Sequence, residues 1–161
     1  MFKPAKPLKK PDDVEHGYNY ALFLLNISMR TEGEIREKMT KRGYFPEIID
    51  EVILRLKNDR YVNDENYAEM FIENSKRFKY YGQFVIFQRM LLKKIPKDLA
   101  KEKLAEFLTP EDEREIATRY VEKEFGALKE VKKFTYEEKQ KVMRRLLSRG
   151  FTMDLAKSLV S

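Results

Sequence analysis

Cysteine is absent from the 161-residue sequence, which excludes disulfide bonds, thiolate chemistry and a cysteine-based zinc site. Histidine occurs once, at His16, so no second imidazole can help it to hold a metal or to act in catalysis. Long apolar runs are missing too, because no segment approaches the ~20 apolar residues of a membrane span. We therefore expect no metal site, no cofactor and no contact with a membrane. The lack of cysteine also fits a cytoplasmic location.

The sequence also lacks the short motifs of common enzymes, including the phosphate-binding loop, the dinucleotide fingerprint, the nucleophile elbow and the zinc-protease helix. Acidic clusters at Asp12-Asp13 and at residues 111–113 could in principle bind a divalent ion. The second cluster falls in the first turn of an expected helix, where acids stabilise the positive end of the helix dipole. We therefore expect no catalytic residue and no enzymatic activity.

Charge of one sign is in moderate excess. Lys and Arg number 33 against 27 Asp and Glu, which gives a net charge of +6 and an isoelectric point near 9.3. Such an excess suits a negatively charged partner, either nucleic acid or an acidic protein groove, although solvated lysine-rich helices produce it as well. Residues 1–16 contain Lys3, Lys6, Lys9 and Lys10 among prolines, and they lack the apolar stretch of a secretory signal. We expect these residues to form a flexible basic arm.

The most informative feature present is an apolar pattern that occurs three times. The pattern around Met39 recurs 51 residues later around Met90 and a further 56 residues later around Leu146. A preceding stripe with i, i+3, i+4 spacing also recurs, as Ala21, Leu24, Leu25, then Ala68, Phe71, Ile72, then Ala117, Tyr120, Val121. This spacing places each stripe on one face of a helix. The sequence therefore predicts an all-α protein of three tandem three-helix repeats, which we assign to residues 17–62, 63–108 and 109–161.

Helix-boundary signals agree with this assignment. The expected helices span 17–29, 32–42, 46–59, 64–79, 82–93, 97–107, 110–125, 135–149 and 153–160. Thr31 with Glu34 and Thr135 with Glu138 fit capping boxes, and Gly43 and Gly150 fit left-handed helix ends. Lys94 replaces the glycine in the second repeat, so it must adopt the left-handed conformation at a cost of roughly 1 kcal/mol or end its helix differently. Repeats of this kind stack end to end, which predicts an elongated, curved, right-handed or similar solenoid-like molecule.

Two groups of residues are candidates for binding a partner. Lys76, Arg77, Lys79, Tyr80 and Tyr81 form a basic and aromatic run at a helix end, where bases could stack or an acidic surface could dock. Lys141, Arg144, Arg145 and Arg149 form a basic stripe on one helix. A solvated helix end and a solvated helix face are the alternatives. Phe84 and Phe87 lie beside the buried stripe of their helix, so at least one should lie under a neighbouring unit or on a binding surface.

Beyond these patterns, the sequence resembles the RecX family of recombination regulators. The resemblance runs from about Tyr18 to Val160, and two stretches carry most of it: Arg30–Tyr44, RTEGEIREKMTKRGY, and Tyr61–Ala68, YVNDENYA. Gly82, Ile86, Ile95-Pro96 and Arg149-Gly150-Phe151 add to it. The second repeat departs from the family, with Gln83, Val85 and Arg89 where a proline, an arginine and a glutamate are usual, and with Lys94 for glycine.

The resemblance implies a fold of three tandem three-helix repeats and a role in homologous recombination, DNA repair and the SOS response. It implies a monomer that binds in the groove of a RecA filament on single-stranded DNA and inhibits filament growth, strand exchange and ATP hydrolysis. A weak direct contact with DNA is a further expectation. The candidate contact residues are Arg30, Lys76, Arg77, Lys79, Tyr81, Arg89, Lys93, Lys94, Lys141, Arg144, Arg145 and Arg149. A free-standing nucleic-acid-binding helical protein and a helical adaptor for another acidic protein are the alternatives.

Overall fold

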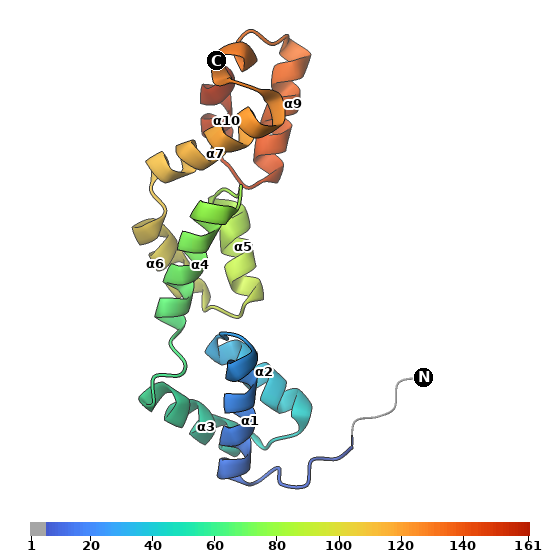
Figure 1. Ribbon diagram of the computed structural model, residues 1–161, viewed down its shortest axis with the longest axis vertical. Coiled ribbons are helices and arrows are strands. Elements are labelled where there is room, and N and C mark those ends of the chain that lie inside the picture. The colour runs from blue at the N-terminus through green and yellow to red at the C-terminus, as the bar shows by residue number, and fades with distance from the viewer. Residues whose placement is uncertain (1–5) are drawn as a thin grey trace. The chain divides into compact units, whose positions relative to one another are not determined.

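The computed structural model describes residues 6–161, and in this range the chain forms helices and no strands (Figure 1). The helices are α1 (Val14–Ile27), α2 (Glu32–Arg42), α3 (Pro46–Asn58), α4 (Asp64–Phe78), α5 (Gln83–Leu92), α6 (Lys97–Phe107), α7 (Pro110–Phe125), α8 (Leu128–Val131), α9 (Tyr136–Ser148) and α10 (Met153–Val160). The predicted all-α class is confirmed.

Two helices differ from the prediction. Helix α1 begins at Val14 rather than at residue 17, because the Asp13 side chain accepts a hydrogen bond from the His16 backbone and caps the helix. Residues 14–16 of the expected basic arm are therefore helical, and residues 1–5 of that arm, with Lys3, lie outside the described residues. Helix α8 was not predicted, since four residues are too short to show a helical period.

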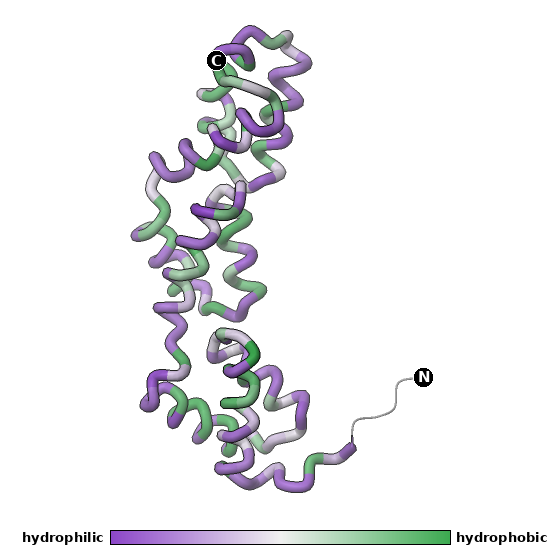
Figure 2. The backbone as a smooth tube through the Cα atoms, in the orientation of Figure 1, coloured by the Kyte–Doolittle hydropathy of each residue, from purple (hydrophilic) through white to green (hydrophobic). Residues whose placement is uncertain are grey.

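The described chain divides into two compact units. The first comprises the chain up to Tyr67 together with Lys93–Ile95, and the second comprises Ala68–Leu92 and Pro96–Ser161. Along the helices of both units, hydrophobic and hydrophilic positions alternate with the helical period (Figure 2). Met39, Met90 and Leu146, the equivalent positions of the sequence repeat, each have 0% exposed surface. The repeated apolar template therefore marks the core positions of both units.

Within the second unit, the start of α5 packs against the turn that follows α9. The Gly82 backbone N–H donates to the Arg149 carbonyl at 2.9 Å, and the Phe84 N–H donates to the Gly150 carbonyl at 3.2 Å. A Cβ atom on Gly82 would lie 2.4 Å from the Gly150 carbonyl oxygen, which is far inside van der Waals contact. Glycine at position 82 therefore permits the close approach of the two backbones.

A similar contact occurs within the first unit at the start of α2. The Thr31 hydroxyl donates to the Lys93 carbonyl, and Lys94 adopts the left-handed conformation with φ of 64°. Of the two alternatives that the sequence left open for this helix end, the left-handed conformation is therefore the one observed.

The predicted capping boxes have different outcomes. The box of Thr135 and Glu138 forms at the start of α9, with both reciprocal hydrogen bonds present. At Thr31 only half of the predicted box forms: the Thr31 hydroxyl accepts from the Glu34 backbone, but the Glu34 carboxylate turns toward Arg30 at 3.8 Å. The prediction of a full box there is wrong, because the arginine competes for the carboxylate.

Candidate partner-binding surface

The second unit gathers cations over tyrosine rings. The link between α4 and α5 carries Tyr80 and Tyr81, while α7 supplies Tyr120. The cations that lie over these rings are Arg89, Arg119, Lys123 and Arg149. We call these seven residues the tyrosine–arginine cluster. The sequence indicated Tyr80, Tyr81, Arg89 and Arg149 as candidates, but it did not indicate Arg119 and Lys123.

Two arginines of this cluster lie over Tyr81. The guanidinium carbon of Arg89 is 4.4 Å from the ring centroid of Tyr81, and that of Arg149 is 5.8 Å from it and 4.7 Å from the centroid of Tyr120. No ion pair joins Arg89 or Arg149 to a carboxylate among residues 6–161. A guanidinium held against an aromatic ring keeps its N–H edge available for a planar anion. These two arginines are therefore suited to bind carboxylate or phosphate.

The remaining cations of the cluster surround Tyr80. The Lys123 ammonium lies 4.8 Å from the ring centroid, and the Arg119 guanidinium lies 5.9 Å from it. Arg119 also donates to the Lys76 carbonyl at 2.6 Å, which fixes its position against the end of α4. The spacing of Arg119 and Lys123, at i and i+4 on one helix, is the sequence signal that could have found them.

A cavity of about 450 Å³ adjoins the cluster at the end of α4. Its lining residues are Phe71, Asn74, Ser75, Phe78, Lys79, Tyr81 and Arg89, and we call it the aromatic pocket. Phe78 is 67% exposed, and the Arg77 guanidinium lies 5.9 Å from the centroid of its ring. The structure therefore brings together three of the sequence candidates, Lys79, Tyr81 and Arg89, around one hollow, and Arg77 lies beside its Phe78 ring.

Lys76, the first residue of the basic and aromatic run, makes contacts within the unit instead. Its ammonium group donates to the Phe107 carbonyl at 2.9 Å and pairs with Asp112 at 3.1 Å and with Glu73 at 3.2 Å. Burial opposes the charged form, yet the hydrogen bonds with the two carboxylates raise the pKa of Lys76. Lys76 thus joins α4 to the α6–α7 junction.

The three candidates in the first unit are also engaged, to different degrees. Arg30 donates from Nε to the Leu24 carbonyl at 3.3 Å and lies 3.8 Å from Glu34. Lys94 pairs with Glu37 at 3.6 Å, and the exposed Lys93 contributes its carbonyl to Thr31. Of these side chains only Lys93 points to solvent without an ion pair in the described part of the chain.

The predicted stripe on α9 separates into two parts. Lys141, Arg144 and Arg145 are exposed and form no ion pair with any described residue. Arg149 leaves the stripe at the helix end, where it lies over Tyr120. The stripe therefore presents three free cations, and the fourth belongs to the tyrosine–arginine cluster.

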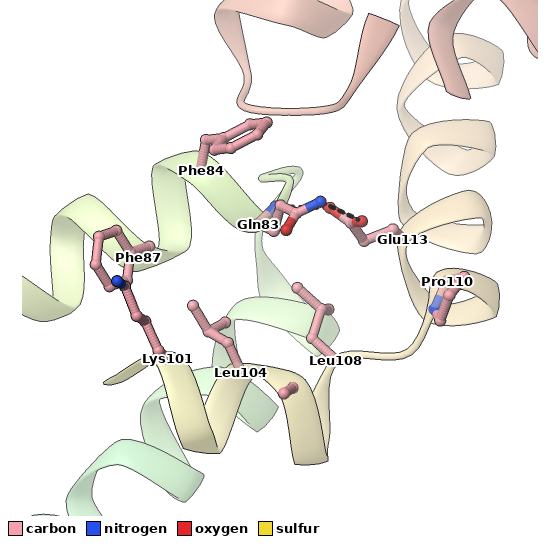
Figure 3. Close-up of a pocket in the computed structure, with 9 residues that line it drawn as sticks. Gln83, Phe84, Phe87, Lys101, Leu104, Leu108, Pro110 and Glu113 are labelled. Carbon is pink, nitrogen blue, oxygen red and sulfur yellow. Dashed lines mark hydrogen bonds between the residues drawn. The ribbon is translucent and has the colours of Figure 1, made fainter. Parts of the chain in front are cut away.

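A second cavity, of about 460 Å³, lies beside α5, α6 and the start of α7 (Figure 3). Phe84 and Phe87 both line it, and Phe84 is 56% exposed, so at least one of them lies off the buried stripe, while its place on a binding surface stays a prediction. Burial raises the pKa of the Glu113 carboxyl in its wall, although the Gln83 backbone N–H donates to this carboxyl at 2.7 Å. Lys101 is the only cation among the residues that line this cavity. The charge of the lining therefore does not indicate which class of molecule would bind there.

His16, the single histidine, shares a hydrogen bond of 2.7 Å between its Nδ1 and the Tyr44 hydroxyl. No group of three or more acidic or imidazole side chains converges closely enough to hold a metal among residues 6–161. None of the helices in the described chain combines the length and the apolar character needed to cross a membrane.

The fold and this surface define a class of protein, a tandem array of three-helix domains with a cationic and aromatic face. Family models identify the array: the first three-helix domain of RecX matches residues 18–56, the second matches 63–104 and the third matches 111–160. The chain therefore belongs to the RecX family. The predicted family and the three tandem three-helix repeats are confirmed, while the exact limits of the repeats and the elongated shape stay predictions.

Curated relatives carry the name Regulatory protein RecX. The relative from Clostridium perfringens (strain SM101 / Type A) is 33% identical over 155 residues, covering 96% of this chain and 72% of the relative. The relative from Bacillus subtilis (strain 168) is 34% identical over 145 residues, covering 89% of this chain and 53% of the relative. These names support a regulatory role for the chain.

Solved structures show the same fold. RecX from Lactobacillus salivarius superposes with a TM-score of 0.81 at 27% identity, covering 92% of this chain and 95% of that one. A second crystal structure of a regulatory protein RecX gives a TM-score of 0.75 at 22% identity, covering 91% of this chain and 70% of that one.

Proposed function

We propose that this protein is a negative regulator of a RecA recombinase, which it binds in the groove of the filament on single-stranded DNA. In this proposal it inhibits filament growth, strand exchange and ATP hydrolysis, acts as a monomer in the cytoplasm, and catalyses nothing itself. Membership of the RecX family is the observation that carries the proposal. The regulatory names of the relatives support it as well.

The tyrosine–arginine cluster supports a protein–protein contact of this kind. Arginine and tyrosine are enriched at the energetically dominant positions of interfaces, and Arg89 and Arg149 lack a carboxylate partner among the described residues. A filament presents the same surface repeatedly, and several weak contacts on one chain add up to useful avidity. We therefore place the main contact at this cluster.

The DNA-dependent ATPase of the RecA from the same organism tests the proposal. Wild-type protein should lower the rate at or below stoichiometric amounts, and the double variant R89A/R149A should need about ten-fold more protein, as expected for loss of two central arginines. The matched control is K129A/K132A, which removes two exposed cations outside the cluster. An unchanged ATPase, together with no co-sedimentation with filaments, contradicts the proposal.

A second candidate function is direct binding of nucleic acid without RecA, which the three unpaired cations of α9 favour. Lys141, Arg144 and Arg145 lie on exposed positions of one helix, as phosphate contacts require. Affinity for single strands should then fall steeply with salt, by about 0.7 log–log units per phosphate contact. A gel shift at two salt concentrations without RecA tests this, and no binding at low salt excludes it.

A further inference from the structure

The aromatic pocket combines flat apolar walls with an open mouth. Phe71, Asn74, Ser75 and Phe78 fall on one face of α4, and Tyr81 completes the wall from the link to α5. Phe78 exposes 67% of its surface at the rim, although a phenylalanine ring gains by leaving water. An exposed ring beside a hollow is therefore a platform on which another planar group can stack.

Cations lie beside these rings, and the lining of the pocket itself contains no carboxylate. Lys79 and Arg89 line the pocket, and Arg77 lies 5.9 Å from the centroid of Phe78. None of the three forms an ion pair in the described part of the chain. The Arg89 guanidinium is held 4.4 Å from the Tyr81 centroid, so its N–H groups are oriented before a ligand arrives. The mouth of the pocket thus fits a phosphate group.

The lining includes an uncharged carboxamide that is available to bind a ligand. The Ser75 hydroxyl donates to the Phe71 carbonyl at 2.8 Å and is used within the helix. The exposed Asn74 carboxamide has both a donor and an acceptor and makes no side-chain hydrogen bond in the described chain. A carboxamide on an aromatic wall can bind the edge of a nucleobase.

From this combination we propose that the aromatic pocket binds one unpaired base of single-stranded nucleic acid, with the phosphate on Lys79 and Arg89. The volume of about 450 Å³ lies within the usual range of ligand pockets. Every nucleotide supplies a planar ring and a negative charge together, whereas an acidic peptide supplies both only where two suitable residues adjoin. The inference extends the second candidate function, adding a base-binding site, and does not depend on regulation of RecA.

Fluorescence anisotropy with a labelled dT20 oligomer tests this assignment, and a 20-unit abasic oligomer of equal charge is the comparison ligand. Wild-type protein should bind dT20 more tightly than the abasic oligomer. F78A should lose about ten-fold or more in affinity for dT20, which is typical of one lost stacking contact, and should bind the abasic oligomer as wild type does. R89A should weaken both ligands and reduce the salt slope by about 0.7.

The matched control is F84A, which removes another exposed phenylalanine, from the cavity beside α6. Thermal melting of both variants checks folding, since neither ring is buried. Equal binding of dT20 and the abasic oligomer by wild type, or equal losses in F78A and F84A, overturns the inference.

Competition with polyglutamate is a second test. If polyglutamate displaces the abasic oligomer but not dT20, base contact is supported, and equal displacement of both oligomers contradicts it. The assay contains no RecA, so its failure leaves the regulatory proposal standing, and the reverse also holds.

Discussion

At the scale of single residues, charge alone did not reveal which cations are free. Lys76 was a candidate because it stands in a basic and aromatic run, and Arg30 was one of the candidate contact residues, but Lys76 is held by Asp112 and Phe107, and Arg30 by Glu34 and Leu24. Asp112 and Phe107 lie on other elements than Lys76, and a sequence shows such pairs only after the fold is known. A lone charge in a sequence is thus weak evidence for a binding role.

The repeat aligned Lys94 with Gly43 and Gly150, which left two alternatives for this helix end, a left-handed residue or a different helix ending, and the first is observed. Its φ of 64° places a Cβ-bearing residue where the two glycines have φ of 106° and 92°. We expect K94G to stabilise the protein by about 0.5–1 kcal/mol, since the left-handed strain is relieved and the exposed pair with Glu37 contributes little. Urea unfolding followed by circular dichroism measures the change.

The neighbouring exposed lysine supplies the control for this prediction. Lys93 has no positive φ, so K93G gains nothing from glycine's freedom and should destabilise the protein by about 0.5–1 kcal/mol. If both variants lose stability to the same extent, the left-handed conformation of Lys94 carries no measurable strain.

At the scale of elements, acids at the start of one helix cap the start of an earlier one. The Asp64 carboxylate, in the first turn of α4, accepts from the Glu32 backbone N–H at 2.9 Å. Glu113, in α7, accepts from the Gln83 N–H at the start of α5. Burial raises the pKa of both carboxyls, although these backbone hydrogen bonds lower it. Glu113, which the sequence assigned to the dipole of its own helix, therefore also serves another helix, as Asp64 does.

The raised pKa of Glu113 makes its contribution to stability depend on pH. The folded state favours the protonated carboxyl, so this contribution is complete below the ordinary value of 4.5 and is lost as the pH rises through the raised pKa. The variant E113Q removes this loss and keeps an oxygen for the Gln83 N–H. We therefore expect its stability relative to wild type to improve between pH 4 and pH 7.5, measured by urea unfolding.

The control for this pH dependence is E111Q, which changes an exposed acid in the same helical turn. Its stability relative to wild type should not improve over this range, because Glu111 has no burial to overcome. A constant difference between E113Q and wild type across the range would show that the ionised carboxylate costs nothing at this site.

The helices were largely predictable, and the site was predictable only in part. Apolar periodicity located all the long helices, because each buries one stripe, whereas α8 is too short to show a period. The basic and aromatic run marked Lys79 and Tyr81, but Asn74 and Phe71 of the pocket lie on an earlier turn of α4 and carried no charge signal. Side chains converge on a hollow only after helices pack, so the sequence indicated a surface and not its shape.

At the scale of the whole molecule, the net charge of +6 is less informative than its distribution over paired and unpaired cations. In the second unit Lys76, Lys103 and Lys133 are paired with carboxylates, whereas Lys141, Arg144 and Arg145 on α9 are exposed and unpaired among the described residues. Unpaired charges act at long range and accelerate encounter with an oppositely charged partner. The α9 cations are therefore expected to affect the association rate more than the stability.

The triple variant K141A/R144A/R145A tests this expectation against K129A/K132A/K157A, which removes three exposed cations elsewhere in the second unit. Both variants have the same net charge, so a difference between them reports the position of the charge. The rate of association with RecA filaments is measured by stopped flow, from the onset of ATPase inhibition. This rate should fall about ten-fold in the α9 variant and less than about two-fold in the control. Since steering is screened by salt, the difference should shrink between 50 and 300 mM salt. Equal slowing in both variants would mean that net charge alone drives the encounter and that α9 does not face the partner.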